Sequence, residues 1–122
     1  MSNRILLVDD DADTARVFRH LLRIDGHTVS VAADMAAALK HLETQPFDLL
    51  ITDIELPDGS GLDLLQCARQ RHSRVKGIVV TGHGEEPHRE KARQAGFDEY
   101  LLKPVDLVAV RQTIGRVVNR SA

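Results

Sequence analysis

Carboxylates gather at two points of the chain where an apolar run stops. Three aspartates at 9–11 directly follow the apolar run 5–8, and Asp53 follows another such run. Two like charges about 4 Å apart repel by roughly 4 kcal/mol at an effective dielectric constant of ~20. If Asp9, Asp10 and Asp53 meet, they raise one another's pKa values unless a cation neutralises them. Mg²⁺ (or Mn²⁺), a hard ion that takes few protein ligands and retains water, suits such a site.

A hydroxyl and an ammonium follow two further apolar runs. Thr81 comes after the run 77–80, and Lys103 comes after the run 98–102. A carboxylate nucleophile, a metal ion, a lysine and a hydroxyl donor are the groups that phosphoryl transfer to an aspartate requires. We therefore predict that Asp53 forms an acyl phosphate, while the metal and Lys103 stabilise charge on the phosphoryl oxygens.

The apolar runs are typical of strands, and segments with helical spacing separate them. The predicted strands are 4–8, 28–32, 47–51, 77–80 and 98–102, and the predicted helices are 13–24, 34–42, a helix beginning at 62, 85–95 and 106–118. Residues 57–61 are predicted to form a turn. Strict alternation favours a parallel sheet with helices on both faces, and one reversal of strand order makes the sheet doubly wound. We predict an α/β, flavodoxin-like fold in three layers (α/β/α), with five helices and five strands in the order 2-1-3-4-5.

In a doubly wound sheet, ligands bind outside the carboxyl ends of the strands, at the reversal point. The chemically capable residues follow strands one, three, four and five, whereas only Ala33 and Asp34 follow strand two. We therefore expect Asp9, Asp53 and Lys103 to converge at one edge of the sheet. Asp34 and Asp106 are expected to cap the second and the last helix.

Two local features are predicted beside the site. Asp11 is expected to cap the first helix and to interact with its dipole rather than to bind metal. The Lys103-Pro104 peptide bond is expected to be cis, because Lys103 must point back into the acidic site while the chain turns at once toward the last helix. Proline makes the cis form accessible at about 0.5–1 kcal/mol.

Composition limits the classes of function. The 122 residues fit one domain, 1–122, with 43% hydrophobic and 28% charged residues. A net charge of −2 and an aromatic content of 3% argue against direct nucleic-acid binding. No apolar run approaches the roughly 20 residues of a membrane helix, and the start lacks a signal peptide. One cysteine, Cys67, fits a reducing compartment, so a cytoplasmic location without membrane contact is expected.

Four motifs make the chain similar to the receiver domains of response regulators in bacterial two-component signalling, of the chemotaxis-regulator type. They are Ile5-Leu6-Leu7-Val8-Asp9-Asp10-Asp11, Asp53-Ile54-Glu55-Leu56-Pro57-Asp58-Gly59 with Gly61, Val80-Thr81-Gly82, and Lys103-Pro104. The resemblance covers essentially the whole chain. The stretches 81–84 and 103–107 also look similar to receivers attached to hybrid sensor histidine kinases.

The resemblance implies a role for each residue of the acidic site. Asp53 becomes the phosphoacceptor in a Mg²⁺-dependent phosphorelay. Asp9 and Asp10 become metal ligands together with Asp53, and the backbone carbonyl of Glu55 becomes a further ligand.

The resemblance also implies roles around the site. Thr81 and Lys103 contact the phosphoryl group, and Thr81 moves toward it when the domain switches. Tyr100 falls where the family often places a switch aromatic, which turns inward and reshapes the surface of the fourth helix, fifth strand and fifth helix. Glu55 and His83 occupy positions that vary in the family and tune the lifetime of the phosphate.

A receiver implies particular partners. The phosphoryl donor is a sensor histidine kinase or a histidine phosphotransfer protein, and the output is a downstream protein or output domain. A homodimer through the fourth helix, fifth strand and fifth helix is a further expectation. Such a domain is not a stand-alone enzyme, although it promotes its own phosphorylation and dephosphorylation, and its parent could be a hybrid histidine kinase.

Three alternative functions share some of these features. A flavodoxin-like cofactor binder shares the fold but needs a Gly, Ser and Thr loop after strand one, where this chain has aspartates. A haloacid-type phosphatase uses an aspartate after strand one with a second aspartate two residues on. The aspartates at 9–11 contain this spacing, but such a function would leave Asp53 unexplained. A receiver-like interaction module that is not regulated by phosphate remains the main alternative, although the five key positions all hold competent residues.

Overall fold

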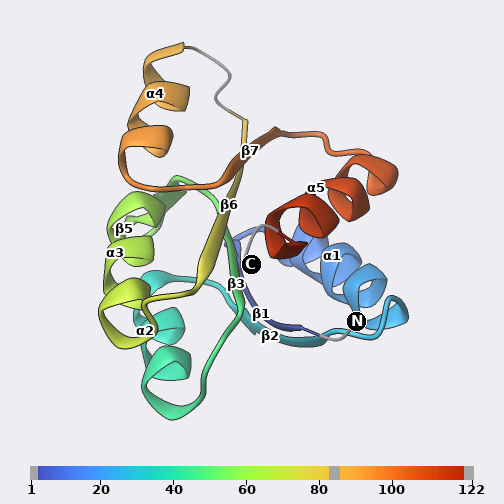
Figure 1. Ribbon diagram of the computed structural model, residues 1–122, viewed down its shortest axis with the longest axis horizontal. Coiled ribbons are helices and arrows are strands. Elements are labelled where there is room, and N and C mark those ends of the chain that lie inside the picture. Colours follow the sequence, from blue (N-terminus) through green and yellow to red (C-terminus); the bar gives the residue numbers. More distant parts are fainter. Residues whose placement is uncertain (1–2, 83–85, 120–122) are drawn as a thin grey trace.

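The computed structural model describes residues 3–82 and 86–119 and has three layers (Figure 1). Five parallel strands form one sheet in the order β2 (Thr28–Ala32), β1 (Arg4–Val8), β3 (Leu49–Thr52), β6 (Lys76–Thr81) and β7 (Glu99–Leu102). One face of the sheet is covered by helices α1 (Ala12–Ile24) and α5 (Leu107–Asn119), and the other by α2 (Met35–Thr44), α3 (Gly61–Arg71) and α4 (Glu86–Gln94). The predicted three-layer fold and strand order 2-1-3-4-5 are confirmed.

Alternating side chains of β1 enter two separate cores. Leu6 and Val8 pack with residues of α2 and α3, whereas Ile5 and Leu7 pack with residues of α1 and α5. Because both faces of the strand are buried, it reads in the sequence as a continuous apolar run instead of an alternating one. The same two-sided burial holds the carboxyl ends of the inner strands at one edge of the sheet.

The predicted boundaries are accurate at some strands and shifted at others. β1 and β2 match the predicted ranges, while β6 is one residue longer at each end. β3 begins at Leu49, where its pairing with Ile5 of β1 starts. Phe47, which is buried, and Asp48, which is exposed, precede the paired residues. The shift places Asp53 directly after the strand, so the predicted geometry of the strand end is kept.

A short hairpin follows β3 and was not predicted. β4 (Glu55–Leu56) pairs antiparallel with β5 (Gly59–Ser60), in the segment where the sequence indicated only a turn. Strands of two residues are too short to show any periodicity in the sequence. The hairpin joins the end of β3 to the beginning of α3.

The helix ends match their sequence signals. Asp11 caps α1 through the backbone N–H groups of Asp13 and Thr14, and Asp34 caps α2 through the N–H of Ala37 at 2.8 Å. The predicted cap of α5 is also present, since Val108 N donates to Asp106 Oδ1 at 3.0 Å. Within residues 3–82 and 86–119, no helix is both long enough and apolar enough to cross a bilayer.

Gly61 lets α3 approach the strand end closely. Its N–H donates to the carbonyl of Ile54 at 2.7 Å. A Cβ atom built on Gly61 would overlap the backbone carbonyl oxygen of Asp53 and would also crowd the side chain of Thr52. Any larger residue must therefore move the backbone of Asp53 or the first turn of α3.

We predict that Gly61→Ala destabilises the protein by more than about 1 kcal/mol, because a backbone overlap cannot be relieved by a side-chain rotation. Gly115→Ala is the matched control, since its Cβ meets no atom within 4 Å. Gly115 lies inside α5, so that substitution should stabilise the protein by about 0.5–1 kcal/mol. Chemical denaturation of both variants measures the two changes, and equal effects would refute this account of Gly61.

Candidate functional site

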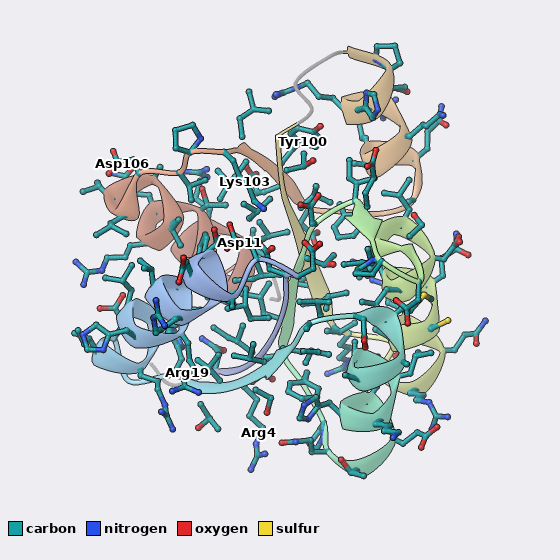
Figure 2. The ribbon with its side chains drawn as sticks, turned by 180° about the vertical axis from the view of Figure 1, so that it is seen from behind. Arg4, Asp11, Arg19, Tyr100, Lys103 and Asp106 are labelled. Carbon is teal, nitrogen blue, oxygen red and sulfur yellow. The ribbon has the colours of Figure 1, made fainter. Side chains whose placement is uncertain are left out.

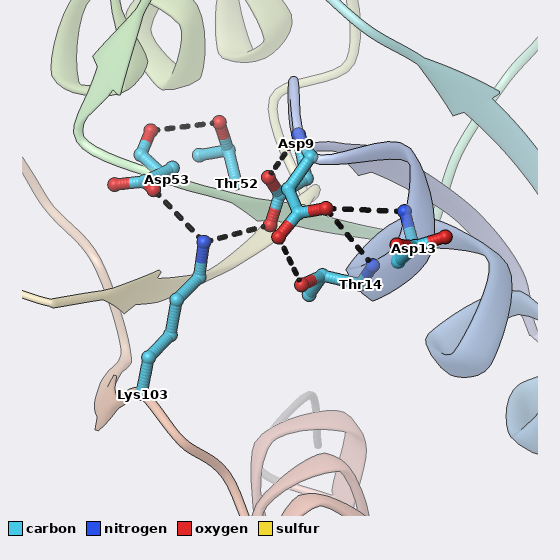
Figure 3. Close-up of polar contacts among 7 residues, drawn as sticks. Asp9, Asp13, Thr14, Thr52, Asp53 and Lys103 are labelled. Atoms are coloured by element: carbon cyan, nitrogen blue, oxygen red, sulfur yellow. Dashed lines mark hydrogen bonds and ion pairs between the residues drawn. The ribbon is translucent and has the colours of Figure 1, made fainter.

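Three strand ends bring two carboxylates and one ammonium together. Asp9 follows β1, Asp53 follows β3, and Lys103 follows β7. Lys103 Nζ lies 3.0 Å from Asp9 Oδ2 and 3.2 Å from Asp53 Oδ2, and Figure 3 shows the ammonium between the two carboxylates. The predicted convergence of these three residues is therefore present in the structure.

This triad of Asp9, Asp53 and Lys103 is largely shielded from solvent. The exposed fractions of the side chains are 5% for Asp9, 15% for Asp53 and 26% for Lys103. Asp9 Oδ1 also accepts a hydrogen bond from the backbone N–H of Asp11 at 2.9 Å. Two carboxylates and one ammonium leave a net charge of −1, so the site remains attractive to a further cation.

Lys103 keeps its proton despite its burial. Burial by itself lowers the pKa of this ammonium, but the hydrogen bonds and charges of Asp9 and Asp53 more than offset that effect. The pKa of Lys103 therefore lies above its usual value. At neutral pH the site holds a fixed positive charge beside the predicted nucleophile.

The backbone around Asp53 is held by bonds from three directions. Its N–H donates to the carbonyl of Val8 at 3.3 Å, and its carbonyl accepts from Thr52 Oγ1 at 2.9 Å. The adjacent Ile54 carbonyl accepts from Gly61. These bonds involve backbone atoms. Among the contacts drawn in Figure 3, the Asp53 carboxylate interacts with Lys103.

Thr81 ends the neighbouring strand β6 and is fully buried. Its backbone carbonyl accepts from the N–H of Lys103 at 2.8 Å, which ties the end of β6 to the lysine. A Cβ on the next residue, Gly82, would meet nothing within 4 Å, so the space beside Thr81 is open. The Lys103-Pro104 bond is cis, as predicted.

The remaining predicted residues lie around the triad instead of within it. Asp10 and the side chain of Glu55 are exposed, although the backbone of Glu55 lies in β4, two residues after Asp53. Tyr100 is half-buried on β7, and the guanidinium of Arg89 lies 4.9 Å from the centre of its ring. Figure 2 labels Tyr100, within β7, and Lys103, which follows that strand. His83 falls outside the described residues.

The donor set fits a hard cation that keeps part of its water. Asp9 and Asp53 direct carboxylate oxygens to one point, as their shared contact with Lys103 shows. Within the described part of the chain, no group of three or more His, Cys, Asp or Glu side chains is arranged to hold a metal ion. Mg²⁺ is usually bound by one or two carboxylates with several waters, so the two converging carboxylates suit it better than a metal that needs a full protein shell.

Comparison with known proteins identifies the family. Residues 5–115 match the response regulator receiver domain, so the chain belongs to that family. It is 36% identical over 95% of its length to the response regulator protein PilR of Pseudomonas aeruginosa, and this match covers 26% of PilR. The chain thus spans about a quarter of the length of that relative.

Solved structures agree with the family. A CheY-like receiver domain protein from Methanospirillum hungatei has a TM-score of 0.92 and 31% identity, and the match covers 99% of this chain and 97% of that one. A response regulator from Burkholderia pseudomallei, solved with a phosphorylated aspartic acid, a calcium ion and citrate, has a TM-score of 0.82 and 26% identity over 88% of this chain and 64% of that one.

Sequence reasoning missed one contact between the segment that follows Asp53 and helix α2. Asp58 was read only as part of a turn, but its carboxylate accepts hydrogen bonds from the first residues of α2. The only sequence signal for this contact was an acidic residue in the Pro57-Asp58-Gly59 turn. Its partner lies more than 20 residues away, so only the fold could reveal the contact.

We predict that Lys103→Met destabilises the metal-free protein by about 1–3 kcal/mol at neutral pH, because it leaves two shielded carboxylates without their shared cation. The raised pKa of Lys103 makes this contribution fully present below its unfolded value of 10.5, and rising pH removes it as the folded value is passed. The difference between parent and variant should therefore shrink above about pH 10.5.

Denaturant unfolding at several pH values measures this difference. Lys40→Met, at an exposed position of α2, is the control and should change stability by less than about 0.5 kcal/mol. A Lys103→Met protein as stable as the control at neutral pH would contradict the importance of the triad.

Proposed function

We propose that this chain is a phosphoryl-accepting receiver domain in which Asp53 takes a phosphoryl group from the phosphohistidine of a histidine kinase or histidine phosphotransfer protein. The observation that carries the proposal is the triad, in which Lys103 Nζ lies within 3.2 Å of carboxylate oxygens of both Asp9 and Asp53. Membership of the receiver family supports the same assignment.

In the proposed reaction, a carboxylate oxygen of Asp53 attacks phosphorus while the bond from phosphorus to the histidine nitrogen breaks. The electron pair of that bond stays on the histidine ring, so no external reductant or oxidant is needed. Asp53 becomes an acyl phosphate. The ammonium of Lys103, already 3.2 Å from Asp53, is positioned to stabilise charge on the transferred phosphoryl oxygens.

Asp9, Asp10, Asp53 and the backbone carbonyl of Glu55 would hold Mg²⁺ (or Mn²⁺). When bound, the ion supplies positive charge that offsets the aspartates and the incoming phosphoryl group. The Burkholderia pseudomallei response regulator, whose structure contains a calcium ion and a phosphorylated aspartic acid, supports the presence of a divalent cation in such a domain.

The output surface is proposed to consist of α4, β7 and α5. Thr81 at the end of β6 and Tyr100 on β7 would link the phosphoryl group to this surface, and Glu55 and His83 would tune how long the phosphate survives. Leu102, Leu107 and Val108 have exposed fractions of 44%, 42% and 56%, which suits contact with an output domain, a downstream protein or a second receiver. A cytoplasmic location is part of the same proposal.

A receiver-like module that binds partners without taking phosphate is the second candidate. Such a module would have the same fold and the same exposed apolar residues, but it would not require a lysine between two shielded carboxylates. The two candidates are separated by whether Asp53 can be phosphorylated.

We predict that Asp53→Asn abolishes phosphorylation and leaves the fold intact, because the amide retains the shape of the carboxylate but cannot form the acyl phosphate. The protein is incubated with Mg²⁺ and acetyl phosphate or phosphoramidate, and intact mass is followed for the gain of one phosphoryl group. Asp63→Asn, at an exposed position in the first turn of α3, is the control and should be phosphorylated normally. Phosphorylation of Asp53→Asn at the parent rate would sink the assignment.

Mg²⁺ is predicted to stabilise the folded protein by about 1.4 kcal/mol at ten times its dissociation constant, since it binds the folded acidic site and not the unfolded chain. Asp10→Ala should lose most of this stabilisation. Without metal, that variant should be at least as stable as the parent, because one unfavourable charge is gone. Thermal unfolding with several millimolar Mg²⁺, against KCl of equal ionic strength, provides the measurement. A parent protein that is indifferent to Mg²⁺ would show that the aspartates hold no such ion.

A further inference from the structure

The segment that follows Asp53 is tied to a helix that contributes nothing to the acidic site. Asp58 lies in the turn of the β4–β5 hairpin and is exposed. Its two carboxylate oxygens accept hydrogen bonds from the backbone N–H groups at the start of α2, from Met35 at 2.7 Å and from Ala36 at 3.0 Å. One side chain thus holds two donors on an element more than 20 residues away.

The start of α2 has two carboxylate caps with separate tasks. The first N–H groups of a helix have no partner within the helix. Asp34, from the chain just before α2, accepts from Ala37 N at 2.8 Å, whereas Asp58 satisfies Met35 and Ala36 from across the fold. The bonds from Met35 and then Ala36 hold the pKa of the Asp58 carboxyl below its usual value, so this group is ionised at neutral pH.

Packing beside the hydrogen bonds confirms that the hairpin rests on α2. A Cβ atom on Gly59 would overlap the sulfur of Met35, so these two residues are in direct contact. Elsewhere the turn has little apolar burial, because Glu55, Pro57 and Gly59 are exposed and Leu56 is the buried residue of β4. A two-stranded hairpin with two paired positions is marginal by itself, and it needs external support to keep one conformation.

The inner end of the same segment is the acceptor. The Ile54 carbonyl is bonded to Gly61 and the Asp53 carbonyl to Thr52, so the segment is fixed at Asp53 by β3 and α3. The outer end depends on Asp58. Glu55, whose carbonyl is the proposed metal ligand, lies between these two anchors. Loss of the outer anchor would give the carbonyl more conformational freedom, and metal binding would then have to order it.

We propose that Asp58 is a positioning residue, which ties the β4–β5 hairpin to the start of α2 and thereby preorganises the Glu55 carbonyl for the cation. This inference rests on the proposed phosphoryl-accepting function. Asp58 itself contacts neither the cation nor the phosphoryl group. Its effect is on the affinity for the ion, while the groups that perform the transfer are unchanged.

Asp58→Ala should therefore weaken Mg²⁺ binding by about three- to five-fold, the ratio that corresponds to loss of a typical helix-cap interaction. The rate of phosphorylation by phosphoramidate at saturating Mg²⁺ should stay at the parent value, since Asp53 and Lys103 remain. Calorimetric titration with Mg²⁺ measures the affinity without any phosphoryl donor. Amide hydrogen exchange should become faster at residues 55–59 as well as at Met35 and Ala36.

Asp34→Ala is the matched control, because it removes a cap from the same helix without touching the hairpin. It should lower stability to a similar degree, yet leave the Mg²⁺ affinity and the exchange of residues 55–59 unchanged. Asp58→Asn should recover part of the affinity, since its amide oxygen can still accept one of the two N–H groups.

The outcomes separate this inference from the function on which it rests. A parent protein that binds Mg²⁺ and takes a phosphoryl group, with Asp58→Ala binding Mg²⁺ equally well, would overturn the role of Asp58 alone. Equal weakening by Asp34→Ala and Asp58→Ala would reduce Asp58 to a helix cap and would also overturn it. A parent protein that takes up neither Mg²⁺ nor phosphoryl group would overturn the proposed function and this inference together.

Discussion

The structure depends most on the placement of one ammonium between two shielded carboxylates. Asp9 and Asp53 meet because parallel strands β1 and β3 are neighbours and end at the same edge of the sheet. Two carboxylates so placed would be costly without compensation, and Lys103 supplies it from the end of β7. Because this lysine comes from the far edge strand, the site forms only when the whole sheet from β1 to β7 is assembled.

The surroundings of the triad divide into rigid and exposed parts. Two cores fix the strands from both faces, so the positions of Asp9 and Asp53 are set by buried apolar contacts. By contrast, several residues in the segments just after the strands are exposed, among them Asp10, Glu55 and Asp58. The hairpin after β3 is the clearest example, because hydrogen bonds from Gly61 to Ile54 and from α2 to Asp58 restrain a segment that has little buried surface of its own. Such an arrangement combines a rigid scaffold with an exposed loop beside the site.

Much of this could be predicted from local patterns. The parallel sheet with helices on both faces followed from strict alternation of strands and helices. The site followed from the rule that ligands bind beyond the carboxyl ends of a doubly wound sheet. The caps at Asp11, Asp34 and Asp106 were visible as acidic residues just before helical spacing begins. The β4–β5 hairpin was not predicted, because two-residue strands have no period to detect and owe their form to neighbours that are distant in the chain.

The sequence by itself determined which residues are chemically capable and that they must lie at one edge of the sheet, since residue type and strand spacing are local properties. Tertiary structure decided which groups actually touch: Lys103 contacts Asp9 as well as Asp53, Asp10 faces solvent, and Asp58 caps α2 instead of serving its own turn. Contacts of this kind depend on distances of a few ångströms between segments far apart in the chain. Packing of the complete sheet and its helices sets those distances, and no local pattern records them.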